Sequence, residues 1–267
     1  MLKTNDFFRF RAITPAALAV ALAIGLAVLP QAPRAQQAAN EPGDPLAGVP
    51  KEAIEQLVRD YLLAHPEVVV EALQRYDRQQ QALEAERLKE ALAAHAEALT
   101  RDKGDPVIGN PEGDVTLVEF FDYRCPYCKR MTDTLAQLVK EDPKLRVVMK
   151  EFPILSRESG QAARAALAAG RQGKYEAFHF ALMENGGGFT DDEILAVAES
   201  VGLDTAKLLS DMQDPEITAV LRRVNALAEA IGITGTPAFV IGDTMIPGAT
   251  SLEALREKIA EVRAKAS

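Results

Sequence analysis

Apolar side chains recur every three or four residues after residue 50, which predicts helices in that part of the chain. In the first predicted helix the apolar positions are Ile54, Leu57, Val58, Tyr61 and Leu62. The pair His65-Pro66 ends this helix, because the residue before a proline is disfavoured in the helical conformation. A second helix is predicted from Pro66 to about Thr100, since no glycine or proline interrupts residues 67–100.

The second half of that long helix carries apolar residues at alternating heptad positions. These are Ala85, Leu88, Leu92 and Leu99, with His95 among them. The pattern fits an amphipathic helix on the chain's own core or a helix that packs against other copies, and we favour self-association because so long a helix has little else to pack on. A turn at residues 103–106 ends the helix. Residues 50–103 are therefore predicted to form an N-terminal helical segment, and residues 104–267 a separate domain.

Residues 104–267 alternate between strand and helix patterns. Strands are predicted at residues 115–121 and 145–152 and in the runs "AFVIG" and "MIPG". Helices are predicted at residues 126–140, 161–169, 175–183 and 215–231, and capping boxes at Thr190 with Glu193 and at Thr250 with Glu253 open two more. This order, with helices filling about 156–231, predicts an α/β sheet with helices on both faces.

The first 49 residues have a composition of their own. Lys3, Arg9 and Arg11 precede an uncharged apolar run at residues 16–29, which is too short to span a bilayer comfortably. This order is typical of a secretory signal peptide, predicted over residues 1–35, with an uncleaved anchor as the alternative. Residues 36–49 lack periodicity and are interpreted as a linker. Export would place the thiols in an oxidising compartment, the periplasm.

Composition and charge narrow the classes of function. Hydrophobic residues make up 48% and charged residues 26% of the chain, which are globular proportions. The formal net charge of −9 argues against binding to nucleic acid or to an anionic membrane surface. His65, His95 and His179 are scattered, and we interpret them as structural or exposed rather than as metal ligands.

Both cysteines of the chain lie in the stretch "FFDYRCPYCKRM". Cys125 falls between a predicted strand and a predicted helix, so its sulfur would lie at the helix N-terminus, where unpaired N–H groups and the helix dipole stabilise a thiolate. Cys128, one turn further, can pair with Cys125 and so resolve a mixed disulfide. Pro126 suits the first turn because its missing N–H removes no helical bond. The pattern predicts a redox-active disulfide that needs no organic cofactor.

Two other uses of such a pair are weaker. A zinc site needs four ligands, which distant histidines or a second subunit would have to complete. A structural disulfide between such close cysteines closes almost no loop and restricts the unfolded chain little. No metal site is therefore predicted.

From about Val107 to its C-terminus the chain resembles the DsbA superfamily of exported thiol-disulfide oxidoreductases, through "EFFDYRCPYC" and "GTPAFVIG". Its signal, its residues 51–100 and its CPYC sequence are similar to ScsC-like and Com1-like members, some of which oligomerise through an N-terminal region. The resemblance implies an α/β thioredoxin fold with an all-helical insertion, preceded by an N-terminal α-helical segment.

The resemblance also implies roles for residues outside the cysteine pair. Thr236 and Pro237 match the residue and the cis-proline that face the cysteines and hold an extended substrate. Glu119, six residues before Cys125, matches a buried acid that exchanges protons with the dithiol. Lys150, on the neighbouring predicted strand, is the hypothesised partner of Glu119.

Tyr127 departs from the pattern of DsbA oxidases, which carry histidine at this position. That histidine helps to stabilise the thiolate, so its absence favours an intermediate reduction potential and isomerase or reductase duty. Pro126 and Tyr127 border the reacting sulfur, and both are assigned to substrate binding.

The predicted activity is thiol-disulfide exchange, as isomerase or oxidase, on unfolded or misfolded exported proteins with cysteines. The resemblance implies a membrane redox partner of the DsbB or DsbD type. The alternative is a periplasmic holdase or a copper(I)-sequestering protein, because two thiolates suffice for a linear Cu(I) site. No tract rich in methionine or histidine supports this alternative.

A homo-oligomer is predicted, with a trimer favoured over a dimer, because joined catalytic domains raise the local concentration of sites around one substrate. Ala85, Leu88, Leu92 and Leu99 would pack between subunits, and "RYDRQQQ" would be a more flexible joint. A form that starts near Gly104 is predicted to be monomeric, folded and more oxidase-like.

Overall fold

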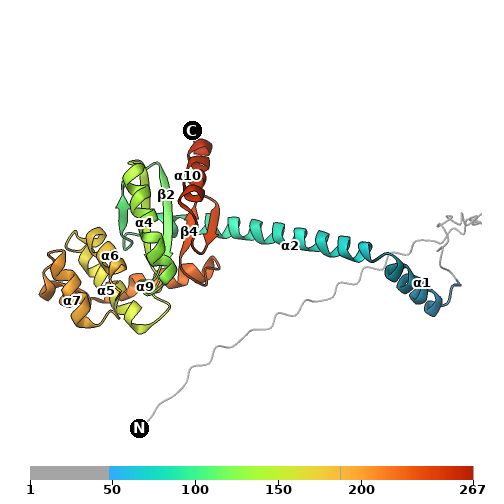
Figure 1. Cartoon of the computed structure of the whole chain (residues 1–267), viewed down its shortest axis with the longest axis horizontal. Helices are drawn as coiled ribbons and strands as arrows, with labels where there is room; N and C mark the ends of the chain where they lie inside the picture. Colours follow the sequence, from blue (N-terminus) through green and yellow to red (C-terminus); the bar gives the residue numbers. More distant parts are fainter. Residues whose placement is uncertain (1–47, 187, 267) are drawn as a thin grey trace, which may run out of the picture. The chain divides into compact units, whose positions relative to one another are not determined.

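The computed structural model describes residues 48–186 and 188–266 (Figure 1). Within these ranges the chain divides into two compact units, the first ending at Ala64 and the second starting at His65. The predicted signal peptide and most of the predicted linker lie outside the described residues, and the predicted domain limits stay predictions. Among the helices of the described ranges, none combines the length and the low polarity that a membrane span requires.

The second unit is built around a five-stranded sheet with the strand order β1-β3-β2-β4-β5. β2 and β3 run parallel, and the other pairings are antiparallel. β2 and β3 are apolar at most positions because both of their faces are covered. The strands are β1 (Val107–Gly109), β2 (Val115–Phe121), β3 (Leu145–Glu151), β4 (Ala238–Ile241) and β5 (Thr244–Pro247).

Helices cover both faces of this sheet, as predicted. α4 (Pro126–Glu141) and α10 (Leu252–Ala266) contact each other and the strands on one face, and Figure 1 shows α4 in front of the sheet. α3 (Ala96–Thr100) and α9 (Pro215–Ala230) contact β2 and β3 on the other face.

Four further helices form the predicted all-helical insertion together with α9. They lie between β3 and α9 in the chain and contact one another. They are α5 (Arg157–Gly170), α6 (Tyr175–Glu184), α7 (Asp191–Ser200) and α8 (Thr205–Asp211). The α/β class with a helical insertion is therefore confirmed.

Side-chain caps fix where α7 and α10 begin. Thr190 and Glu193 form the predicted capping box, in which each side chain accepts the backbone N–H of the other residue, at 3.3 and 2.8 Å. The capping box predicted at Thr250 and Glu253 is wrong. Ser251 caps α10 instead, because its Oγ accepts the N–H of Ala254 at 3.1 Å.

Three elements of the second unit were not predicted correctly from the sequence: β1 and α8 were missed, and the start of α5 was placed too late. β1 and α8 contain three and seven residues, which is too short for a periodic pattern to reveal them. α5 begins at Arg157 rather than at Gln161, because Ser156 Oγ accepts the N–H of Ser159 and caps the helix there.

α2 (Pro66–Ala94) ends earlier than its pattern predicts, since His95 separates it from α3. The side chains of Leu92 and Leu99 are buried in the core of their own chain, and Leu88 packs against that core. For Leu92 and Leu99 the prediction of packing between subunits is therefore wrong, because their own sheet and helices already cover these two side chains. For the half-buried Leu88 and the exposed Ala85 it stays a prediction.

The earlier part of α2 carries a different apolar stripe. Val69, Leu73, Tyr76 and Leu83 are all exposed, at successive spacings of four, three and seven residues. This spacing is that of a heptad seam and places the four side chains along one side of the helix. The sequence analysis missed this stripe because the apolar spacing in the second half of the helix is more regular. In the structure no other part of the described chain covers these four side chains.

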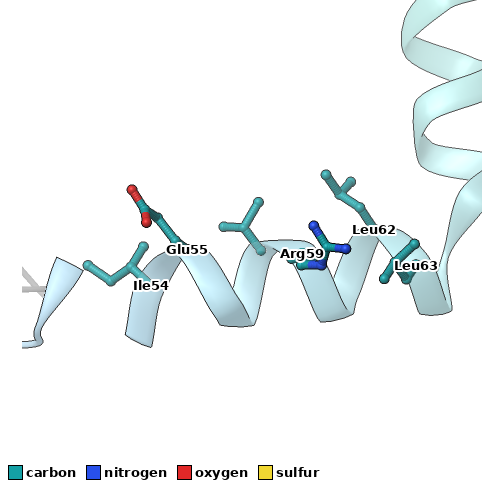
Figure 2. A pocket seen from close by; sticks show the side chains of 6 residues that line it. Ile54, Glu55, Arg59, Leu62 and Leu63 are labelled. Atoms are coloured by element: carbon teal, nitrogen blue, oxygen red, sulfur yellow. The ribbon is translucent and has the colours of Figure 1, made fainter. Parts of the chain in front are cut away.

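α1 (Lys51–Ala64) is the described helix of the first unit, and none of its residues is buried. Ile54, Val58 and Leu62 recur every four residues and line an open apolar hollow along the helix, with Leu63 beside them. Figure 2 shows this hollow, with the charged side chains of Glu55 and Arg59 among its lining residues. The apolar face predicted here is thus uncovered within the described chain.

Candidate functional site

Cys125 and Cys128 lie at the start of α4, as predicted. Cys125 is the N-cap residue with an extended backbone, and Pro126 follows at the first helical position. The N–H of Cys128 points at the Cys125 sulfur, with the nitrogen 3.4 Å from Sγ. Both cysteines are free thiols and both are buried. A thiolate on Cys125 would meet this N–H and the positive end of the helix dipole.

Thr236 and Pro237 lie against the Cys125 sulfur. The Cys125 thiol donates a hydrogen bond to the carbonyl oxygen of Thr236 at 3.2 Å, and the peptide bond between Thr236 and Pro237 is cis. Thr236 is half-buried and Pro237 is buried. A hollow of about 220 Å³ adjoins them, lined by residues 232–238, Met245, Pro247 and Gly248. The fold thus brings together two pairs of residues that lie more than a hundred positions apart in the sequence.

Glu119 is buried in β2 on the dithiol side of the sheet. Burial raises its pKa to about 8, and the nearby Cys125 adds to the rise. Burial also raises the pKa of the Cys128 thiol far above its usual range, and Glu119 adds to that rise. The carboxyl and the dithiol are therefore electrostatically linked. A carboxyl whose pKa lies near neutrality is suited to hold and release a proton there.

Lys150 does not pair with Glu119, contrary to the hypothesis from the sequence. Glu119 lies opposite Met149 in the sheet, whereas Lys150 lies opposite Phe120. Because successive strand residues point to opposite faces, the two side chains project to opposite sides of the sheet. Lys150 forms a buried ion pair with Asp105 instead.

Pro126 and Tyr127 lie between the two cysteines in the first turn of α4, and both are exposed. The Tyr127 side chain is 54% exposed, and the guanidinium of Arg130 lies over its ring, 4.1 Å from the ring centre. A tyrosine supplies no positive charge to the neighbouring thiolate, as a protonated histidine would. Both residues directly follow Cys125 in the chain, and their role in substrate binding stays a prediction.

Asp122 is a residue of the site that the sequence reasoning missed. It follows β2 directly, and its buried carboxylate accepts the N–H groups of Arg124, Ile154 and Leu155. Its backbone carbonyl accepts the N–H of Cys125 at 3.0 Å. An acid at the end of a strand, just before a loop, is the signal that could have found it, because such acids bind nearby backbone N–H groups.

A buried polar cluster lies between the sheet and α6. Glu151 Oε1 accepts hydrogen bonds from the hydroxyls of Tyr123 at 3.0 Å and Tyr175 at 2.8 Å. Nδ1 of His179 lies 3.0 Å from the Tyr123 hydroxyl. Burial lowers the pKa of His179 to about 3, so the ring is neutral at ordinary pH. The interpretation of His179 as a structural histidine agrees with these contacts.

Possible metal ligands do not gather at this site. In the part of the chain that the structure describes, no three His, Cys, Asp or Glu side chains converge as a metal site would require. The two thiols at the start of α4 are the sulfur ligands available there.

Two family models match this chain. A model described as the DSBA-like thioredoxin domain matches residues 116–260, which contain both cysteines as well as Thr236 and Pro237. A model described as the copper resistance protein ScsC N-terminal domain matches residues 51–82. The second match covers α1 and the part of α2 with most of the exposed apolar stripe.

Solved structures with a similar fold include a thioredoxin-like oxidoreductase from Silicibacter pomeroyi. It is 49% identical, with 63% of this chain and 97% of that chain covered and a TM-score of 0.61. A linker-deletion variant of ScsC from Proteus mirabilis is 30% identical, with 84% of this chain and 99% of that chain covered and a TM-score of 0.63.

Among curated proteins the chain is similar to the Na⁺/H⁺ antiporter NhaA 1 of Salinispora arenicola, with 29% identity over 153 residues. The match covers 57% of this chain but 24% of the antiporter, so the chain spans about a quarter of that relative's length. The DSBA-like model, in contrast, matches more than half of this chain, and the matched residues include Cys125, Cys128 and Pro237. The chain therefore belongs to the DSBA-like thioredoxin-domain family.

Proposed function

We propose that this chain catalyses thiol-disulfide exchange on exported proteins in the periplasm, with Cys125 as the attacking group and Cys128 as the resolving group. The position of the Cys125 sulfur carries the proposal. It lies 3.4 Å from the N–H donor of Cys128 and 3.2 Å from the carbonyl oxygen of Thr236. One neighbour stabilises a thiolate, and the other belongs to a backbone segment beside which an extended substrate can lie.

In the reductive direction the exchange proceeds in two steps. The Cys125 thiolate attacks one sulfur of a substrate disulfide, forms a mixed disulfide and expels the other substrate sulfur as a thiolate. Cys128 then loses its proton and attacks the Cys125 sulfur, which forms the Cys125–Cys128 disulfide and expels the second substrate thiolate. Two electrons pass to the substrate. Oxidation is the reverse, and neither direction needs an organic cofactor.

In this proposal the Glu119 carboxylate accepts the proton of the Cys128 thiol and later returns it. The Cys128 thiol is buried and its pKa is raised, so it attacks when a neighbouring group accepts its proton. The Glu119 carboxyl has a pKa of about 8, raised by burial and by Cys125. A group with such a pKa exchanges protons readily near neutral pH.

Thr236, Pro237, Pro126 and Tyr127 are proposed to hold the substrate. The carbonyl of Thr236 already accepts a hydrogen bond from the Cys125 thiol, and the segment around it borders an open hollow. An extended substrate chain would lie along this segment like an added strand, with its cysteine at Cys125.

For the direction in the cell we propose disulfide isomerisation in preference to strong oxidation. Tyr127 lies under the guanidinium of Arg130 and supplies no charge of its own to the Cys125 thiolate. A less stabilised thiolate goes with a less oxidising disulfide. A membrane redox partner of the DsbB or DsbD type would complete the cycle and fix the direction.

We also propose that the chain acts as a homo-oligomer, with a trimer favoured. The face of α1 and the stripe of Val69, Leu73, Tyr76 and Leu83 on α2 are uncovered within the described chain. Apart from Leu83, both lie in the part that the ScsC N-terminal model matches. Packing these surfaces between copies would bring several dithiols to one substrate.

The test is refolding of a protein with scrambled disulfides, with Cys125→Ser and Cys128→Ser as matched variants. The wild-type chain is expected to restore native pairing, and Cys125→Ser to fall to the uncatalysed rate. Cys128→Ser is expected to accumulate mixed disulfides, because their resolution fails. Refolding by Cys125→Ser at the wild-type rate contradicts the proposal.

Copper(I) binding and holdase activity form the second candidate. The model that matches residues 51–82 is named for a copper resistance protein, and two thiols suffice for a linear Cu(I) site. Titration with Cu(I) against a competing chelator, done beside the exchange assay, separates the candidates. Tight binding of Cu(I) without thiol-disulfide exchange activity would favour copper(I) sequestration over the exchange function.

A further inference from the structure

Arg130 follows Cys128 by two positions on α4, and its guanidinium is turned back toward the cysteines. The central carbon of the guanidinium lies 4.1 Å from the centre of the Tyr127 ring. The two residues are three positions apart, which places them on one side of the helix. Helical side chains lean toward the N-terminus of their helix, and in α4 that end is capped by Cys125. The positive charge of Arg130 is therefore held at the dithiol end of α4.

Three cations lie close to the cysteines in the chain, and two of them have polar partners. The guanidinium of Arg124 forms an ion pair with Glu158 at 3.1 Å. The ammonium group of Lys129 donates a hydrogen bond to the carbonyl oxygen of Asn185. Arg130 differs from both, because in the part of the chain that the structure describes its side chain forms neither an ion pair nor a hydrogen bond.

The acids of α4 do not neutralise Arg130 either. The first turn of this helix contains no acid, and the next acid after Arg130 is Asp133. The Arg130 side chain lies over Tyr127, in the direction away from Asp133. A guanidinium carries five N–H donors in a fork that matches a carboxylate. On a chain with a formal net charge of −9, Arg130 thus offers an anion a local site of opposite charge.

The Tyr127 ring holds this charge within reach of a substrate. An exposed arginine otherwise samples many rotamers, and the attraction between guanidinium and ring favours one of them. Arg130 lies about 7.5 Å beyond Cys125 along the helix, and its side chain leans back over part of this distance. An extended substrate advances about 3.3 Å per residue, so its side chains one or two positions from the reacting cysteine reach the same region.

We infer that Arg130, held against the Tyr127 ring, is a specificity-determining residue that favours substrate segments with an aspartate or glutamate one or two positions from the cysteine. This inference rests on the proposed function. The substrate carboxylate accepts the N–H groups of the guanidinium and meets a positive charge beside Cys125, on a chain that is otherwise negative. A lysine at the same substrate position meets a like charge and is repelled.

The test is a competition on the full-length Cys128→Ser chain, which lacks the resolving thiol and traps each substrate as a mixed disulfide with Cys125. The substrates are two short peptides with one cysteine each, in a disulfide with uncharged mercaptoethanol. One peptide has aspartate on both sides of the cysteine, and the other has lysine. Mass spectrometry at early times gives the ratio of the trapped peptides. Division by the ratio of the rates at which uncharged dithiothreitol reduces them removes their intrinsic reactivity.

The corrected ratio is expected to favour the aspartate peptide at low salt and to fall as added salt screens the charges. Arg130→Gln is expected to lose roughly 3-fold of this ratio, as for an exposed ion pair. Tyr127→Leu keeps the charge but removes the ring, and is expected to lose part of the ratio. Arg222→Gln, at an exposed position of α9 on the other face of the sheet, changes the net charge equally and is expected to keep the ratio.

Four outcomes overturn the inference and leave the proposed function intact, because both peptides still react. They are a corrected ratio of one in the parent chain, a ratio that does not change with salt, equal losses in Arg130→Gln and Arg222→Gln, and the full ratio in Tyr127→Leu. A parent chain that traps neither peptide overturns the inference and the proposed function together. These three substituted side chains are exposed, so the fold is expected to tolerate each change, and circular dichroism checks this.

Discussion

The ammonium group of Lys150 and the carboxylate of Asp105 form an ion pair whose side chains are 1 and 3% exposed. Lys150 Nζ also donates a hydrogen bond to the carbonyl oxygen of Ala98 in α3, at 2.5 Å. Burial raises the pKa of Asp105 to about 6 and lowers the pKa of Lys150, so desolvation outweighs the mutual attraction for each group. Lys150 thus joins β3 to α3 and to the segment before β1, but the ion pair is a weak source of net stability.

The first prediction concerns this pair. Lys150→Met is expected to lower the free energy of unfolding by about 3 kcal/mol, because it leaves the Asp105 carboxyl buried without its partner. The double variant Lys150→Met/Asp105→Leu is expected to lose less than Lys150→Met alone, since it removes both desolvated charges. Urea denaturation of the full chain at pH 7 measures both values. Additive losses in the double variant would show that the two groups do not interact.

The second prediction concerns Glu119 and pH. In the folded, reduced chain its pKa is about 8, against the ordinary value of 4.5. Between these values the folded state holds a proton that the unfolded state has lost, so the stability contributed by this group falls as pH rises from about 5 to 8. Glu119→Gln is expected to remove this slope of about 1.4 kcal/mol per pH unit.

The measurement is urea denaturation of reduced wild-type and Glu119→Gln chains at several pH values. His179, with its pKa lowered to about 3 by burial, contributes stability that is lost as pH falls below its ordinary value of 6.5. Both chains share this effect, so it cancels in their difference. A difference that is constant between pH 5 and 8 would mean that Glu119 is ionised in both states.

The sequence was informative where local chemistry and periodicity decide. The apolar run of β2, the two cysteines after it and Pro126 at the first helical position together locate the dithiol, because each depends on residues close in the chain. The face to which Lys150 points could not be predicted. It depends on the pairing register of β3 with β2, and a shift of one residue reverses the face.

The helical segment shows a second limit of the same kind. Leu92 and Leu99 form a pattern that suits a partner chain and their own sheet equally well, so periodicity alone cannot decide between them. Asp122 was missed for another reason. Its carboxylate binds the N–H groups of Ile154 and Leu155, which approach it only after β3 has paired with β2.

The third prediction concerns the buried cluster around Glu151. Tyr175→Phe keeps the ring but removes the hydroxyl that donates to Glu151 at 2.8 Å. The free energy of unfolding is expected to fall by about 1–3 kcal/mol, because a buried acceptor loses a donor. Tyr76→Phe, on an exposed position of α2, is the matched control, and its change is expected to stay within about 0.5 kcal/mol. Equal changes in the two variants would show that Glu151 finds another donor.

The fourth prediction locates the surface that joins copies of the chain. Leu73→Ser/Leu83→Ser removes the two leucines of the exposed α2 stripe, and we expect the oligomer to dissociate because the seam between copies loses its apolar contacts. Arg78→Ser, at an exposed polar position of the same helix, is the control and should leave the mass unchanged. Light scattering of the full chain at micromolar concentration measures the mass, and a wild-type mass of one chain would rule out the proposed oligomer.

Leu92→Ala completes this comparison, because it separates an interface role from a core role within one helix. Leu92 is buried in its own chain, so its truncation is expected to lower the free energy of unfolding by about 2–4 kcal/mol. The mass of the folded particle is expected to stay the same, since the exposed stripe is intact. If Leu92→Ala instead dissociates the oligomer without loss of stability, the second half of the helix packs between copies after all, and the leucines at 73 and 83 face solvent.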